Sequence, residues 1–188
     1  MPKRHIYWDT SVFLCFLNRG EDDRRKICED ILQHARDEEV EIFTSTFTIA
    51  EVIRPKNRSI PNSRQLAPDE VIKIKAMFRW PFITPIELDE RTASFASDLA
   101  REHNLMPADA VHAASAILWK LDVLQAWDRD FSSVSEKIRV DQPRWISPQP
   151  HLLGMEPKPI GPTPNDFEIL VPAAPEILIK DSANEVTT

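Results

Sequence analysis

The chain has 188 residues, 42% of them hydrophobic, and its formal net charge at pH 7 is −7. This length fits one ordinary domain with at most an appendage, and the acidic balance disfavours a protein that binds polyanions over its whole surface. No apolar run approaches the ~20 residues that cross a bilayer, and residues 1–9 lack a signal-peptide core, so we expect a cytoplasmic protein without a membrane partner.

Apolar periodicity and capping residues predict strands that alternate with helices along the chain. The expected strands cover residues 5–8, 41–44, 82–88, 122–127 and, as a short last strand, 137–140. The expected helices cover residues 11–17, 22–39, 45–54, 68–80, 89–103 and a segment within 106–121. Pro68 and Pro107 suit first helical turns, Asp89 suits an N-cap, and Pro85 places the third strand near a sheet edge.

This alternation through short connections indicates a parallel sheet with right-handed crossovers. We therefore predict an α/β fold, an α/β/α sandwich with a short central parallel sheet, over residues 1–147. Residues 148–188 are acidic and hold half of the sixteen prolines, so we expect an extended or disordered extension. The alternatives for its role are an autoinhibitory segment, a segment that docks on a partner chain, or a simple extension.

The composition excludes several kinds of site. The three glycines cannot build a Gly-rich phosphate loop, a dinucleotide fingerprint or a Gly-x-Ser-x-Gly elbow. The histidines and cysteines do not fall at zinc spacing, and we interpret Cys15 and Cys28 as small buried hydrophobes. Any chemistry is therefore expected to rest on carboxylates.

Four carboxylates are expected at one edge of the sheet. The stretch HIYWDTSVFLCFL, residues 5–17, places Asp9 at the end of the first strand, inside an apolar run without a neighbouring cation. Glu51 is placed early in the helix after the second strand, Asp109 near the start of the helix before the fourth strand, and Asp128 directly after that strand. In parallel sheets the functional crevice lies outside the carboxyl ends of the strands, where all four are predicted to meet.

Each carboxylate also has an ordinary structural interpretation. Asp9 suits a helix N-cap, Glu51 a solvated helix position, Asp109 a first helical turn and Asp128 a turn, as does its neighbour Asp130. Four independent structural roles at one sheet edge are less probable than a single site that uses all four carboxylates. Because clustered carboxylates repel each other, they call for a cation, and oxygen-only ligands favour Mg²⁺ or Mn²⁺. Such a site suits phosphoryl chemistry.

A local basic window is the candidate contact for phosphates. Between residues 52 and 80 seven basic residues face two acidic ones. The alternatives are a solvated helix face with a loop, or a phosphate-binding patch. Within its loop the candidate RNA-binding residues are Arg54, Lys56, Arg58 and Arg64.

Three further side chains near these carboxylates are ambiguous. His112 follows Asp109 by three residues, and we favour a hydrogen-bonded structural histidine over a general base. Trp8 and Trp127 are candidates for stacking on a base, although both adjoin strands and suit the core.

Taken together, the segments DTS, AE, PADAVHAASA and DRDF resemble the PIN domain, especially ribonuclease toxins of the VapC type. The resemblance covers about residues 5–145. It implies a metal-dependent endoribonuclease in which Asp9, Glu51, Asp109 and Asp128 bind Mg²⁺ or Mn²⁺. Ser11 would support a ligand or hold water, and Asp130 would be auxiliary. Family members commonly form homodimers, and an antitoxin protein commonly inhibits the toxins by filling the acidic cleft.

Two features depart from this family. Where a threonine or serine often lies two places before the last metal-binding aspartate, this chain has Ala126, so we expect a lower metal affinity or activity. The proline-rich extension lies outside the usual compact toxin. The main alternative function is a PIN-like binding or scaffold module with weak or no catalysis. A phosphatase of the haloacid dehalogenase type is disfavoured because Ser11 replaces its second aspartate, and a structure-specific 5′-nuclease is disfavoured because no extra DNA-binding helices are predicted.

Overall fold

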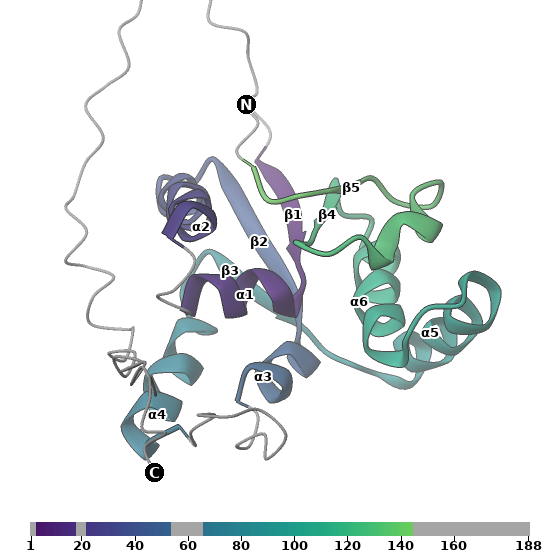
Figure 1. Cartoon of the computed structure of the whole chain (residues 1–188), viewed down its shortest axis with the longest axis horizontal. Coiled ribbons are helices and arrows are strands. Elements are labelled where there is room, and N and C mark those ends of the chain that lie inside the picture. The colour runs from purple at the N-terminus through teal and green to yellow at the C-terminus, as the bar shows by residue number, and fades with distance from the viewer. Residues whose placement is uncertain (1–2, 18–21, 54–65, 145–188) are drawn as a thin grey trace, which may run out of the picture.

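The computed structural model describes residues 3–17, 22–53 and 66–144, and these form a parallel sheet of five strands in the order β3-β2-β1-β4-β5 (Figure 1). The strands are β1 (Arg4–Trp8), β2 (Val40–Ser45), β3 (Ile83–Ile86), β4 (Val123–Gln125) and β5 (Val140–Asp141). Ile6 of central β1 pairs with Ile42 of β2 and with Val123 of β4. The predicted α/β/α sandwich is therefore confirmed, and β3 with its proline is an edge strand.

Helices cover both faces of the sheet (Figure 1). One face carries α1 (Thr10–Leu17), α2 (Asp22–Arg36), α3 (Thr46–Val52) and α4 (Pro68–Met77). The other face carries α5 (Glu90–His103), α6 (Pro107–Leu118) and the 3₁₀ turn η1 (Asp130–Val134). The predicted extension at 148–188 and the basic loop lie outside the described residues.

Strand alternation divides the described core into two layers. In β1, Ile6 and Trp8 point into the layer under α1 and α2, whereas Tyr7 points into the layer under α5 and α6. Trp8 is 0% exposed, packs edge-to-face on Phe13 with ring centroids 5.4 Å apart, and donates from Nε1 to Gln125 Oε1. The hypothesis that Trp8 stacks on a base is therefore wrong, because the strand directs its ring into the core.

The alanines of α6 let that helix lie close to the sheet. Ala110, Ala113, Ala114 and Ala116 are all fully buried, and small side chains reduce the spacing between packed elements. The close packing of these alanines fixes the position of every α6 residue relative to the strands.

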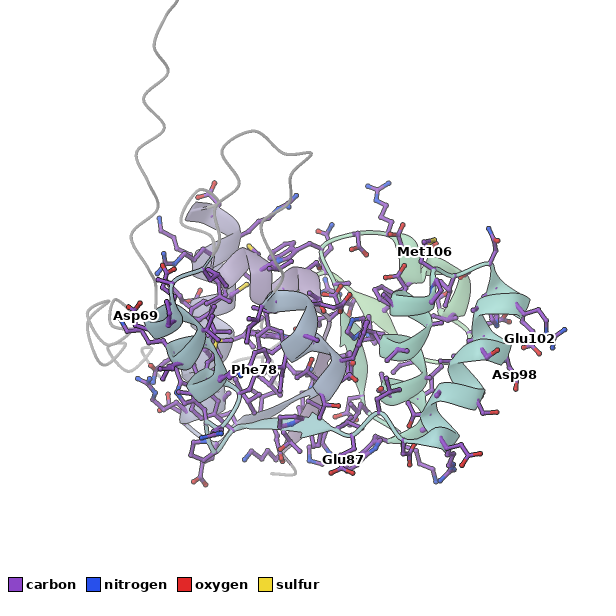
Figure 2. All side chains as sticks on the ribbon, turned by 90° about the horizontal axis from the view of Figure 1, so that it is seen from below. Asp69, Phe78, Glu87, Asp98, Glu102 and Met106 are labelled. Atoms are coloured by element: carbon purple, nitrogen blue, oxygen red, sulfur yellow. The ribbon has the colours of Figure 1, made fainter. Side chains whose placement is uncertain are left out.

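The side chains shown in Figure 2 separate surface from core. Asp98 and Glu102 of α5 point outward, whereas Phe78 points inward beside α4.

The capping of α5 agrees with the sequence prediction, whereas several predicted element bounds differ from the structure. Asp89 caps α5 by accepting from the Thr92 N–H at 2.8 Å. The helix predicted over 22–39 ends at Arg36 because Glu38 adopts a left-handed backbone with φ 62°. The helix predicted over 68–80 ends at Met77, and the last strand is shifted to Val140–Asp141.

Cys15 and Cys28 are both buried and take part in no disulfide, as predicted. Within the described ranges, no helix has the length and apolar character needed to cross a membrane.

Candidate active site

The carboxyl edge of the sheet receives the predicted acidic residues from different elements. Asp9 joins β1 to α1, and Asp109 is the third residue of α6. Asp128 lies in the loop after β4, and Asp130 begins η1. Glu51 is the penultimate residue of α3, so the prediction that it lies early in its helix is wrong, because α3 is only seven residues long and begins at Thr46.

These carboxylates are close enough to perturb one another. Burial raises the pKa of Asp9 to about 6; the Ser11 hydroxyl and His112 oppose this rise and the charge of Asp128 adds to it. The pKa of Asp109 is raised by burial and then by the charges of Asp128 and Asp130, with a smaller contribution from Glu51. Partial desolvation and the charge of Asp130 raise the pKa of Asp128, whose side chain is otherwise exposed. The four predicted ligands and Asp130 thus form one electrostatically coupled group.

The donor chemistry of this group fits a hard divalent cation. All the carboxylates supply oxygen, which Mg²⁺ and Mn²⁺ prefer, and a cation would relieve the mutual repulsion that adds to the effect of burial on the pKa values of Asp9, Asp109 and Asp128. In residues 3–17, 22–53 and 66–144, however, no three His, Cys, Asp or Glu side chains are arranged so that they could hold one ion. The charges are brought together, and the ligand set remains a prediction.

Ser11 connects Asp9 to the loop that carries Asp128. Its Oγ donates to Asp9 Oδ1 at 2.7 Å and accepts from the Trp127 N–H at 3.0 Å. The same Asp9 oxygen accepts from the Val12 N–H at 3.2 Å, so Asp9 also caps α1. The structural interpretation of Asp9 and its expected place at the site are therefore compatible. Ala126, where the family often has a threonine or serine, supplies no hydroxyl to this loop. The Ser11 hydroxyl lies beside the same segment, at the Trp127 N–H.

We expect Ser11→Ala to lower the free energy of unfolding by about 1–2 kcal/mol, because it removes two hydrogen bonds around a buried carboxylate. Urea denaturation measures this change. Ser133→Ala, at an exposed position of η1, is the matched control and should change stability by less than about 0.5 kcal/mol. Equal losses in the two variants would contradict the bridging role.

Glu51 is held by residues that sequence reasoning did not assign to the site. Thr10 Oγ1 donates to Glu51 Oε2, and the same oxygen lies 2.9 Å from His112 Nε2. His112 is 2% exposed, which agrees with a hydrogen-bonded structural histidine, and its Nδ1 lies 2.8 Å from the Tyr7 hydroxyl. Thr10 lies within the DTS segment and His112 within PADAVHAASA, but Tyr7 has no local signal beyond strand alternation.

The aromatic and basic candidates have different outcomes. Trp127 is partly buried against the core, with the Arg24 guanidinium 5.0 Å from its ring centroid, so stacking on a base stays a prediction. The candidate RNA-binding residues lie outside the described residues, and they also stay predictions; they are Arg54, Lys56, Arg58 and Arg64.

Comparison with solved structures finds the same fold in other proteins. VapBC2 from Rickettsia felis, solved with a DNA fragment from its promoter, matches with a TM-score of 0.53 and 13% identity, over 73% of this chain and 98% of that one. A toxin–antitoxin complex from Klebsiella pneumoniae matches with a TM-score of 0.51 and 19% identity, over 75% and 99%. VapC20 of Mycobacterium tuberculosis, a Sarcin-Ricin loop cleaving toxin, matches with a TM-score of 0.54 and 18% identity, over 69% and 94%.

Comparison of the sequence itself gives two results. No curated protein matches it significantly. The PIN domain family matches residues 6–137, a range that runs from β1 into the loop before β5. Because this match covers more than half of the 188 residues, the chain belongs to the PIN domain family.

Proposed function

We propose that this PIN domain protein is an endoribonuclease that depends on Mg²⁺ or Mn²⁺, and that it is the toxin of a type II toxin–antitoxin pair. The observation that carries the proposal is the coupled acidic group at the carboxyl edge. Asp9, Asp109 and Asp128 have raised pKa values there, as expected for carboxylates gathered to meet a cation. The likeness to VapC20, a Sarcin-Ricin loop cleaving toxin, supports RNA as the substrate class.

In the proposed site Asp9, Glu51, Asp109 and Asp128 hold the metal ion. When bound, such an ion supplies an activated water molecule and stabilises negative charge on the phosphate. The chain's own residues provide the positioning: Ser11 and the Val12 N–H fix Asp9, and Thr10 with His112 fixes Glu51. Asp128 is exposed, so RNA would approach from the side of its loop.

Cleavage of a labelled single-stranded RNA pool tests this proposal. We expect cuts with Mg²⁺ or Mn²⁺ that disappear with EDTA and that fall at least about 100-fold in Asp128→Asn. Asp98→Asn is the matched control, because Asp98 projects from α5 into solvent (Figure 2) and its replacement should leave cleavage unchanged. Cleavage that persists in EDTA and in Asp128→Asn would refute a metal-dependent nuclease.

The alternative is a PIN-like binding or scaffold module with weak or no catalysis. Two observations favour it: Ala126 has no hydroxyl, and no three metal-binding side chains converge among the described residues. A protein that binds RNA or a protein partner but yields no cuts with either ion would support this alternative.

The likeness to toxin–antitoxin complexes supports an antitoxin as the protein partner. We expect a short upstream gene to encode a DNA-binding antitoxin, and adding its product should stop cleavage in the same assay. Unchanged cleavage with that product would argue against a toxin–antitoxin pair.

We also propose that the protein is a homodimer. Analytical ultracentrifugation should then give twice the chain mass of 21.6 kDa, and a monomer mass would contradict the homodimer. We also propose a cytoplasmic location.

A further inference from the structure

His112 connects a buried tyrosine to a proposed metal ligand. It lies on α6, and its ring meets Tyr7 of β1 edge-to-face with centroids 5.8 Å apart. Its Nδ1 lies 2.8 Å from the Tyr7 hydroxyl and its Nε2 lies 2.9 Å from Glu51 Oε2. Both ring nitrogens are therefore engaged, one with the core and one with the acidic edge.

The hydrogen-bond chemistry of this chain places a proton on Nε2. An ionised carboxylate oxygen only accepts hydrogen bonds, so the 2.9 Å contact between Nε2 and Glu51 Oε2 requires the proton on Nε2. The Tyr7 hydroxyl can then donate to Nδ1, which lies 2.8 Å away. Glu51 therefore receives an N–H donor from a ring that cannot move freely.

Glu51 needs such an anchor because its own helix does not favour its charge. It lies at the penultimate position of α3, where the negative end of the helix dipole disfavours a carboxylate. Its side chain is one quarter exposed, and its rotatable bonds would otherwise leave it in several rotamers. Thr10 donates to the same oxygen, Oε2, and lies 3.2 Å from His112 Nε2, which completes a compact cluster.

Each anchor lies close in the chain to another proposed ligand. Thr10, the first residue of α1, directly follows Asp9, and His112 lies one turn of α6 after Asp109. Holding Glu51 through these two residues therefore fixes it relative to Asp9 and Asp109. Side chains behind metal ligands commonly set ligand orientation, and their loss costs 10–100-fold in metal affinity.

We propose that His112 is a positioning residue that holds the Glu51 carboxylate, through a hydrogen bond at Nε2, at the acidic edge where the proposed divalent cation would bind. This inference rests on the proposed function and adds to it a residue that contacts neither the RNA nor the ion. It predicts that metal affinity depends on a donor at the position of Nε2 and not merely on a polar residue at 112.

Two substitutions separate these possibilities. In His112→Gln the amide nitrogen can occupy the position of Nε2, whereas in His112→Asn the shorter amide reaches only that of Nδ1. Calorimetric titration with Mn²⁺ measures the affinity of each full-length variant. We expect His112→Gln to stay within about 3-fold of wild type and His112→Asn to weaken Mn²⁺ binding at least about 10-fold.

A double-mutant cycle tests whether His112 acts through its partner. In a Glu51→Gln background, His112→Asn should cause no further loss of Mn²⁺ affinity, because the carboxylate to be held is already absent. An additional loss of the same size in that background would overturn the inference. So would equal Mn²⁺ affinities of His112→Asn and wild type, or equal losses in the Gln and Asn variants, with urea denaturation showing that each is folded.

A measurement on the unaltered chain keeps the inference testable if His112→Asn does not fold. Long-range ¹H–¹⁵N NMR assigns the protonated nitrogens of His112, and we expect Nε2 to carry a proton without metal. An unprotonated Nε2 would overturn the inference alone. Wild-type protein that neither binds Mn²⁺ nor cleaves RNA would instead remove the proposed function, and this inference with it.

Discussion

Replacing Asp9 by asparagine will abolish RNA cleavage and, at the same time, stabilise the metal-free protein at neutral pH. Cleavage should fall at least about 1000-fold, since the substitution removes a charged ligand at the centre of the proposed site. Metal-ion stabilisation of a transition state is worth several kcal/mol, and each 1.36 kcal/mol corresponds to a factor of ten in rate. The RNA assay described above, with excess Mg²⁺, measures this loss.

The gain in stability follows from the same side chain. Burial raises the pKa of Asp9 from 3.8 to about 6, which corresponds to about 3 kcal/mol of free energy spent on keeping the carboxylate ionised in the folded state at pH 7.5. Asparagine removes the charge, and its Oδ1 can still accept from Ser11 Oγ and the Val12 N–H. The free energy of unfolding should therefore rise by up to about 3 kcal/mol.

Urea denaturation at pH 7.5 in EDTA measures this second effect. Asp98→Asn is again the matched control, because Asp98 is exposed on α5 and should change stability by less than about 0.5 kcal/mol. The two effects of Asp9→Asn have opposite signs, so simple misfolding cannot produce both. An Asp9→Asn protein that is less stable than wild type without metal would contradict this account of the site.

Adding Mg²⁺ will raise the free energy of unfolding at pH 7.5 and raise it much less at pH 4.5. At 100 times the dissociation constant, ligand binding stabilises a folded protein by about 2.7 kcal/mol. The proposed ligands bind metal when ionised, and Asp9, with its pKa near 6, is protonated at the lower pH.

Without metal, the contribution of Asp9 to the free energy of unfolding should depend on pH in the opposite direction. Because the folded pKa of Asp9 lies above its unfolded value, the folded state binds more protons between pH 3.8 and about 6. The contribution of Asp9 to stability is therefore largest at low pH and declines as the pH rises through this window. Asp109 and Asp128 have raised pKa values and act in the same direction.

Thermal and urea denaturation at both pH values, with EDTA and with Mg²⁺, check this prediction. The Asp9→Asn variant is the control, since its stability should respond weakly to Mg²⁺ at either pH. The prediction would be contradicted if Mg²⁺ raised the free energy of unfolding equally at pH 4.5 and 7.5, or if it still did so in Asp9→Asn. Either result would show that the ion does not act through these carboxylates.

Much of the fold could be predicted because its signals are local. Pro68 and Pro107 each begin a helix in the structure, Asp89 caps α5, and the proline-containing strand β3 lies at the sheet edge. Alternation of strands and helices also predicted the parallel sheet, and with it the edge at which the carboxylates gather. Each of these features depends on a few neighbouring residues or on the period of a single element.

The sequence by itself therefore determined the order of elements, the sandwich and the four acidic candidates. The tertiary structure decided which side chains hold them, because the partners are far apart along the chain. Thr10 and Glu51 are separated by 41 residues, His112 and Glu51 by 61, and Ser11 and Trp127 by 116. Periodicity predicts which face of an element is buried, but only the packing of α1, α3 and α6 around the sheet brings a particular hydroxyl or imidazole within hydrogen-bonding distance of a particular carboxylate.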